Sequence, residues 1–95
     1  MNKRMIDVIK NGKKFETEYF TLYLKNSCNF LKMGFKINFH FSTSVTRNRI
    51  KRIFRSLIRE TFENGDIIVR IKSGCKGLTG EEIRKEWTAI KKKVF

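Results

Sequence analysis

The residues of this chain best suited to chemistry are cations at the spacing of an α-helix. Between residues 46 and 60, polar side chains able to bind phosphate recur at short intervals; they are Arg47, Asn48, Arg49, Lys51, Arg52, Arg55 and Arg59. The apolar residues of the same stretch follow the pattern i, i+3, i+4, i+7 and i+8; they are Ile50, Ile53, Phe54, Leu57 and Ile58. At about 100° per residue, this pattern predicts a helix with one side in the core and a bank of cations on the other.

A charged helix face is often simply solvated, and this alternative has to be weighed. Solvated faces usually mix signs, with Glu four residues before Lys stabilising the helix slightly. Here Glu60 is the only acid, and the pairs Lys51–Arg55 and Arg55–Arg59 place like charges one turn apart. Arg47 also lies in the first turn, where the helix dipole disfavours positive charge. Since several local rules are broken together, the pattern favours a helix that binds a polyanion.

Composition points to the same kind of partner. The 95 residues carry a formal net charge of +13, which predicts attraction to nucleic acid or another anionic surface. Lys and Arg recur between Glu18 and Glu60, whereas Asp and Glu do not occur there. The length predicts a single domain over residues 1–95. No apolar run is long enough to span a membrane, and the first residues lack the apolar segment of a secretory signal, so we expect a cytoplasmic protein.

Neither the cysteines nor the known catalytic patterns indicate an active site. Cys28 and Cys75 are far apart without C-x-x-C spacing, and with the single His40 they form a poor metal-binding set. Two free thiols in a reducing compartment are the simpler interpretation. Patterns for nucleophilic catalysis, a zinc protease or a phosphate-binding loop are missing, as are paired carboxylates placed for acid–base work. We therefore expect no catalytic residue in this chain.

The residues ahead of the cationic stretch predict one helix and two strands. Residues 2–10 place apolar side chains at helical spacing; these are Met5, Val8 and Ile9. Residues 15–25 and 35–41 alternate with period two, so we expect two strands that pair antiparallel, with one face buried and the other in water. The wet face would carry Tyr19, Tyr23, Lys36, Asn38 and His40. Such a face is either ordinary surface or a platform on which single-stranded nucleic acid stacks.

The residues after the central helix predict one more strand and a last helix. Residues 66–72 form a strand with Arg70 and Lys72 toward the wet face, and the order strand–helix–strand predicts that it lies parallel to a neighbour. Thr79 and Glu82 have the spacing of a capping box. They open a helix whose apolar stripe is Ile83, Trp87, Ile90 and Val94. We interpret this helix as structural, with the lysines at 91–93 as a weak secondary contact to RNA.

The central motif has a close counterpart in a known family. Arg47-Asn-Arg-Ile-Lys-Arg52, followed by Arg55, matches the pattern R-N-R-x-K-R-x-x-R. Here the chain resembles the protein subunit of bacterial ribonuclease P, and weaker matches fall in order around the motif; they are Gly12, Phe20, Tyr23, Gly34, residues 66–72 and residues 78–82. The resemblance implies an α/β (α+β) two-layer sandwich with the order αβββαβα and a small mixed sheet. It also implies a left-handed crossover between parallel strands, an exception to the usual right-handed rule.

The resemblance implies a protein cofactor of a catalytic RNA that removes the 5′ leader from precursor tRNA. The RNA subunit would hold most of the Mg2+ and cleave the phosphodiester bond. The partners would be the ribonuclease P RNA and precursor tRNA with its leader, with no membrane and no protein partner required. The residues that match the RNA-facing motif are Arg47, Asn48, Arg49, Lys51, Arg52 and Arg55, and Arg59 shares their helix face. Metal ions would lie near Arg47, Asn48 and Arg49 without being ligated by the protein.

A leader-binding cleft is implied as well. Tyr23 matches an aromatic residue of the family's cleft. The other residues expected to line it are Met5, Ile9, Tyr19, Lys36, Asn38 and His40. Met5 and Ile9 stand where the family commonly has aromatic residues, and Asn38-Phe39-His40 stands where it has Ser-Lys-Lys. A histidine that is mostly neutral at pH 7 thus replaces a lysine, so we expect leader affinity to be weaker or differently distributed.

Other kinds of protein share some of these features. A structural RNA-binding protein, for instance a ribosomal one, would have the same charge and the same lack of catalytic residues. It would not lower the Mg2+ concentration needed to cleave precursor tRNA. A DNA-binding helix-turn-helix protein fits less well, because strands flank the central helix. A membrane-surface binder fits least, since the apolar stripe is needed for the core.

Overall fold

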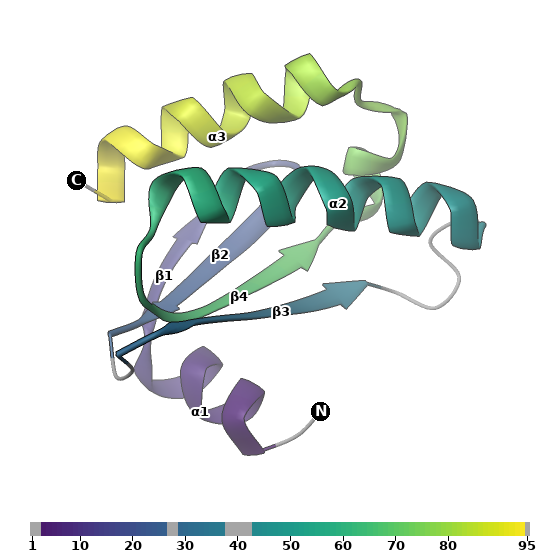
Figure 1. Cartoon of the computed structure of the whole chain (residues 1–95). Helices are drawn as coiled ribbons and strands as arrows, with labels where there is room; N and C mark the ends of the chain where they lie inside the picture. Colours follow the sequence, from purple (N-terminus) through teal and green to yellow (C-terminus); the bar gives the residue numbers. More distant parts are fainter. Residues whose placement is uncertain (1–2, 27–28, 38–42, 95) are drawn as a thin grey trace.

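The fold is described by a computed structural model that covers residues 3–26, 29–37 and 43–94. The bounds of its main elements are α1 Lys3–Asn11, β1 Lys13–Glu16, β2 Phe20–Lys25, β3 Leu31–Ile37, α2 Ser44–Thr61, β4 Gly65–Ile71 and α3 Gly80–Val94. A 3-10 turn, η1 Ser73–Gly77, joins β4 to α3. Figure 1 shows α2 and α3 over one face of the sheet and α1 against the other face. Within the described ranges, no helix is both long enough and apolar enough to cross a membrane.

The described strands form one mixed sheet in the order β1-β2-β4-β3. The strand predicted over residues 15–25 is two strands, because β1 and β2 form an antiparallel hairpin with Phe15 opposite Leu22. The predicted antiparallel pairing of residues 15–25 with residues 35–41 is wrong, since β4 lies between β2 and β3. β4 runs antiparallel to β2 and parallel to β3, as expected for a strand that follows a crossover helix. Its first five residues are buried on both faces of the sheet, as suits a strand between two others.

The main core lies between the sheet and the pair of helices α2 and α3. The ring centroids of Phe20 and Phe54 are 5.0 Å apart, and the Trp87 ring lies 6.1 Å from each of them. The other buried members of this core are Leu22, Ile50, Leu57, Ile58, Ile67, Val69, Ile71, Cys75, Ile83 and Ile90. The Trp87 Nε1–H donates to Thr61 Oγ1 at 2.9 Å and so joins α3 to the end of α2. The apolar stripes predicted for both helices therefore face one common core.

Both long helices begin at side-chain caps. Thr43 Oγ1 accepts a hydrogen bond from the Thr46 N–H at 3.3 Å, so α2 begins at Ser44. At α3, the Glu82 N–H donates to Thr79 Oγ1 at 3.2 Å, and the Thr79 N–H donates to Glu82 Oε1 at 3.1 Å. This reciprocal pair confirms the predicted capping box.

A smaller apolar cluster holds α1 against the opposite face of the sheet. Its buried members are Val8, Tyr23 and Ile68, and Ile9 packs at its border. At the end of α1 the Gly12 N–H donates to the Val8 carbonyl oxygen at 2.8 Å. A Cβ at Gly12 would lie 2.5 Å from the carbonyl oxygens of Val8 and Leu24. Glycine is therefore required where the chain turns from α1 into β1.

Candidate nucleic-acid interface

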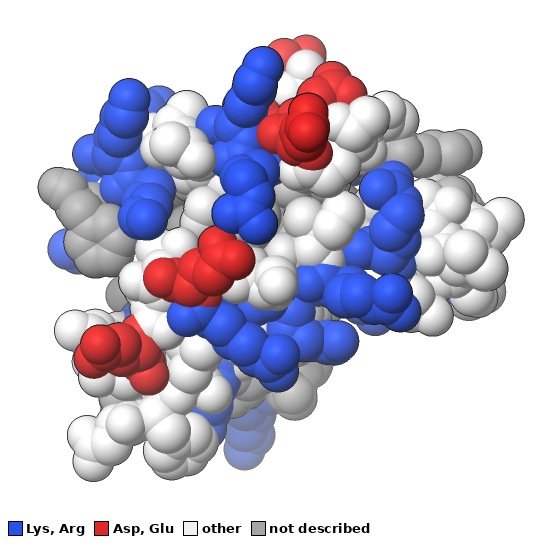
Figure 2. All heavy atoms as spheres, turned by 45° about the horizontal axis from the view of Figure 1, so that its top comes forward, with Lys and Arg blue, Asp and Glu red and all other residues white. Residues whose placement is uncertain are grey.

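α2 presents most of its cations to solvent. The residues buried beneath the helix are Ile50, Phe54, Leu57 and Ile58. Of the residues predicted to bind RNA, those exposed on its outer side are Asn48, Arg49, Arg52, Arg55 and Arg59, while Arg47 and Lys51 are half-buried. Seen from the side of α2 and α3, the surface carries broad patches of Lys and Arg and smaller groups of Asp and Glu (Figure 2). The prediction of a helix with a core side and a cationic side is confirmed.

The protein's own carboxylates leave this cationic side of α2 largely unneutralised. Among the residues that the structure describes, no Asp or Glu lies within ion-pairing distance of Arg49, Lys51, Arg52, Arg55 or Arg59. Glu60, the one acid of α2, pairs with Arg84 of α3 at 3.0 Å between Oε2 and Nη1. That hydrogen bond lowers the pKa of the Glu60 carboxyl group, so Glu60 stays ionised and engaged with α3. The positive charge of α2 therefore remains available to a partner.

Uncharged groups position several of the arginines. The Arg49 Nη2–H donates to the Leu78 carbonyl oxygen at 3.3 Å, and the Arg47 Nη2–H donates to Ser44 Oγ at 3.1 Å. The Arg55 guanidinium lies 5.6 Å from the centroid of the Phe35 ring on β3, as in a cation–π contact. Such contacts orient a guanidinium without cancelling its charge. For Arg49 and Arg55, this leaves a planar fork of donors that matches the oxygens of a phosphate.

The amino-terminal end of α2 adds to the positive potential, since its first turn carries no acidic residue. α2 and α3 run in the same direction, so their amino-terminal ends lie at the same side of the molecule (Figure 1). Each helix amino terminus carries the equivalent of roughly half a positive charge. Arg47 and Arg49 lie in the first turns of α2, and the bond from Arg49 to Leu78 ties this end to the segment that leads into α3. The first turn of α3 carries Glu81 and Glu82, so an anion would bind at the start of α2, where it meets Arg47, Arg49 and the helix end together.

The sheet face beneath α1 differs from the predicted open platform. Tyr23 is only 6% exposed because α1 covers its ring, so the prediction that it stands on a wet face is wrong. Lys36 is exposed as predicted, and its partner across the β3–β4 ladder is Arg70, which is also exposed. By strand alternation Arg70 shares the face of the buried Ile68, which is the face that α1 covers in part. The predicted leader-site residues that fall outside the described part are Asn38, His40 and the side chain of Met5.

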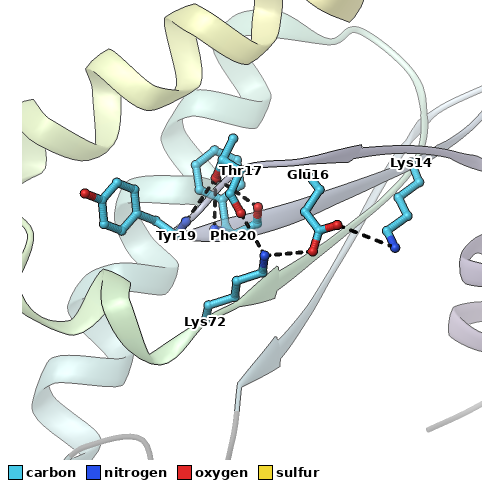
Figure 3. Close-up of polar contacts among 6 residues, drawn as sticks. All are labelled: Lys14, Glu16, Thr17, Tyr19, Phe20 and Lys72. Carbon is cyan, nitrogen blue, oxygen red and sulfur yellow. Dashed lines mark hydrogen bonds and ion pairs between the residues drawn. The ribbon is translucent and has the colours of Figure 1, made fainter.

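The turn between β1 and β2 is closed by a polar network. Thr17 Oγ1 accepts hydrogen bonds from the N–H groups of Tyr19 at 3.2 Å and Phe20 at 3.0 Å (Figure 3). Lys72 Nζ donates to Glu16 Oε2 and to the Thr17 carbonyl oxygen, both at 2.8 Å. This ammonium group lowers the pKa of the Glu16 carboxyl group. Lys72, expected on the wet face, is therefore engaged in holding this turn.

Tyr19 lies apart from Tyr23. Its ring packs against the main core, on the face of the sheet that carries α2 and α3. The nearby carboxylate of Glu18 raises the pKa of the Tyr19 hydroxyl, and burial and the carboxylates of Glu86 and Glu82 raise it further. The predicted grouping of Tyr19 and Tyr23 on one wet face is therefore wrong, because Tyr19 packs against the core under α2 and α3 whereas Tyr23 lies under α1.

The described residues contain no cluster of side chains that would suit a metal. No three His, Cys, Asp or Glu side chains come close enough together, within residues 3–26, 29–37 and 43–94, to hold a metal ion. Cys75 is a free thiol that is fully buried, and burial raises its pKa to about 11. It behaves as an apolar core residue.

A cavity of about 630 Å3 lies at the far end of α2 from Arg47 and Arg49. It is enclosed by the ends of α1, α2 and α3 and the start of β4, over an apolar floor that includes Phe15, Leu24 and Ile67. Its charged lining residues are of mixed sign; they are Lys13, Lys25 and Glu63. The cavity is therefore separate from the cationic side of α2.

Comparison with known proteins decides the family. Residues 2–94 match the sequence model of the family Ribonuclease P. The chain belongs to the ribonuclease P protein family. The ribonuclease P protein component of Natranaerobius thermophilus is 30% identical over an alignment of 91 residues, which covers 90% of this chain and 79% of the relative. That of Macrococcus caseolyticus is 32% identical over 96 residues, covering 96% of this chain and 84% of the relative.

Solved ribonuclease P proteins have the same fold. The structure from Staphylococcus aureus aligns with a TM-score of 0.87 over 99% of this chain and 91% of that one, at 22% identity. The structure from Thermotoga maritima aligns with a TM-score of 0.80 over 96% of this chain and 91% of that one, at 20% identity. The α+β architecture and the order αβββαβα expected from the resemblance are confirmed. As a ribonuclease P protein, the chain is a subunit of an endoribonuclease that acts in tRNA processing.

Proposed function

We propose that this chain is the RNA-binding cofactor of ribonuclease P and helps its RNA subunit remove the 5′ leader from precursor tRNA. The observation that carries the proposal is the cationic side of α2, where Arg49, Arg52, Arg55 and Arg59 have no carboxylate partner among the described residues. Glu60 beside them pairs with Arg84 of α3 instead. Leaving like charges together costs stability unless a polyanion neutralises them. A folded RNA supplies phosphates at the density that such a row of cations needs.

The division of labour in this proposal follows from the charges. Arg47 and Arg49 attract phosphates and repel Mg2+, and Asn48 between them is uncharged, so the metal ions are held mainly by the RNA subunit. The phosphodiester bond is cleaved by that RNA. The role of the protein is to neutralise phosphates near the junction and to hold the substrate, which favours the compact arrangement in which the RNA binds its metal.

The leader, in this proposal, passes over the open part of the sheet beside α1. Lys36 and Arg70 are adjacent there and exposed, and Ile9 borders the same region from α1. Tyr23 supports this surface from beneath, since its ring is covered. The single strand is therefore bound here through phosphate neutralisation more than through stacking.

Changing Lys36 and Arg70 to alanine is expected to weaken binding of precursor tRNA and to leave mature tRNA nearly unaffected. Each lost phosphate contact should reduce the slope of log affinity against log salt by about one unit for the precursor alone. The measurement is a salt titration of binding by the assembled enzyme. Lys85→Ala on α3, which removes an exposed lysine elsewhere, is the control. Equal losses for precursor and mature tRNA would remove both residues from the leader site.

The proposal as a whole is tested by reconstitution. The purified chain, added to the host's ribonuclease P RNA, should lower the Mg2+ concentration at which precursor tRNA is cleaved at the leader junction. An RNA-binding protein of structural type would bind RNA without this change. If cleavage needs the same Mg2+ with and without the chain, the proposed function is wrong.

A further inference from the structure

Phe30 is an aromatic side chain placed where solvent reaches it. In the described part of the chain it is the most exposed aromatic residue, with 61% of its surface accessible. It stands directly before β3, and its carbonyl oxygen accepts a hydrogen bond from the Gly65 N–H at 3.2 Å. This bond ties its backbone to the first residue of the central strand β4. The ring therefore projects from a fixed point of the sheet.

A lysine already covers one part of this ring. Lys32 Nζ lies 5.0 Å from the centroid of the Phe30 ring, which is cation–π geometry. An exposed apolar residue standing alone would need no explanation. A phenyl ring paired with an ammonium group is different, because it offers a stacking surface and a phosphate-binding charge at one place. Single-stranded nucleic acid is bound by such pairs, since every base has an aromatic face and every linkage a negative charge.

The Phe30–Lys32 pair lies in line with the proposed leader surface. Along β3, strand alternation puts Lys32, Gly34 and Lys36 on the face that α1 partly covers. Gly34, whose ladder partner is Ile68, has no side chain, so nothing stands out from the surface of β3 between Lys32 and Lys36. The two ends of this row are cationic. Lys32 and Lys36 are four residues apart, which is roughly 13 Å along a strand. The carboxylate opposite Lys32 in the β3–β4 ladder is that of Asp66, which is only 3% exposed and presents little charge to the surface. The other nearby carboxylate, Asp7 of α1, is paired with Lys25.

We propose that Phe30 stacks an unpaired nucleotide of the precursor tRNA leader and that Lys32 neutralises the adjoining phosphate. The leader then runs along β3 from Lys36 and Arg70 to Phe30. This inference rests on the proposed function, because it requires that the leader enters at Lys36. It adds a second contact site at the opposite end of β3, which only leaders long enough to cover the strand can reach.

The test uses the assembled enzyme and precursor tRNAs whose leaders increase in length one nucleotide at a time. For the unaltered chain, affinity should rise in a step when the leader becomes long enough to reach Phe30. Phe30→Ala should abolish this step, which amounts to roughly five- to tenfold for one base stacked on a partly occupied ring. Shorter leaders and mature tRNA should bind as before. Because the ring is exposed, folding should be unaffected, which circular dichroism checks.

Matched variants separate stacking from other effects. Phe30→Leu keeps an apolar side chain without an aromatic face and should behave like Phe30→Ala, whereas Phe30→Trp should restore the step. Lys32→Gln should reduce the salt slope by about one unit for long leaders only. A loss that is equal for all leaders and for mature tRNA would mean that Phe30 contacts the RNA subunit, and would overturn the inference. A Phe30→Ala variant that retains the step in affinity would also overturn the inference. So would a variant that binds every RNA normally but no longer associates with a second copy of the chain, because Phe30 would then be a protein contact.

Failure of this inference is distinguishable from failure of the proposed function. If the chain lowers the Mg2+ requirement and Lys36→Ala weakens precursor binding, but Phe30→Ala changes nothing, the leader leaves the sheet before Phe30. If the chain shows no preference for precursor over mature tRNA, the proposed leader surface itself is wrong.

Discussion

Replacing Arg52, Arg55 and Arg59 together by alanine is expected to remove about three phosphate contacts from the complex with the ribonuclease P RNA. The slope of log affinity against log salt should fall by about 0.9 per contact. When the salt concentration rises from 50 to 200 mM, the fold-loss of affinity should then be roughly 40 times larger for the unaltered chain than for the variant. Binding at low salt should be weakened strongly, since these three residues are exposed and lack carboxylate partners among the described residues. The measurement is a filter-binding or fluorescence titration at several salt concentrations.

The same triple variant should fold about as stably as the unaltered chain, because the loss of the Arg55–Phe35 cation–π contact is offset by the relief of like-charge repulsion. Its arginines take part in no described ion pair, and the change removes the like-charge pairs Lys51–Arg55 and Arg55–Arg59. A matched control removes three exposed lysines away from α2, namely Lys10, Lys13 and Lys85, and so has the same net charge. If the control flattens the salt slope as much as the triple variant, binding depends on total charge and not on α2. An unchanged slope in the triple variant would contradict the assignment of this helix.

Phe54→Ala is expected to destabilise the fold by about 3–5 kcal/mol, as for other phenylalanines removed from a packed core. Phe54 is fully buried, and its ring contacts those of Phe20 and Trp87 at the centre of the main core. A loss of this size is a large part of the roughly 5–15 kcal/mol that stabilises a typical domain. The free energy of unfolding, measured by urea denaturation, tests it. Ser56→Ala, an exposed position on the same helix, should change stability by less than about 0.5 kcal/mol.

This variant also separates the two sides of α2. Since Phe54 does not face solvent, the folded fraction of Phe54→Ala should bind RNA like the unaltered chain. Excess RNA should shift the folding equilibrium of the variant toward the folded state, because a ligand that binds the folded state stabilises it. A weakened intrinsic affinity in the folded protein would mean that the core and the cationic side are not independent. A loss in stability below about 1 kcal/mol would mean that Phe54 is not at the centre of the core.

The helices could be predicted from the sequence because their signals are local. The apolar spacing of residues 50–58, the Thr79–Glu82 capping box and the stripe through Trp87 each lie within one helix, and all three are confirmed. The cationic side of α2 follows from the same spacing. These features depend only on residues that are close together in the sequence, so they can be predicted without knowing the rest of the fold.

The strand neighbours could not be predicted in this way. Alternation shows that a segment is a strand, but it does not show which strand lies beside it, and β4 enters between β2 and β3 from a distant part of the chain. The covering of Tyr23 by α1 is likewise a contact between distant segments. Arg70 was expected on the wet face but was not among the predicted leader-site residues. Its signal was present, since it is a lone cation inside the apolar run of a central strand, where an arginine is tolerated only at an open position.

The central place of β4 also bears on how the chain folds as it is made. β2 and β3 share no hydrogen-bonded edge, and both pair with β4, which leaves the ribosome after every other described strand. Until residue 71 has emerged, the earlier strands lack the template that would join them, and the apolar side of α2 has no complete surface to cover. Such late, long-range pairing slows folding compared with a helical bundle of equal size. The RNA-binding side of α2 can therefore become ordered only when β4 is complete, although β4 makes none of the RNA contacts proposed for that side.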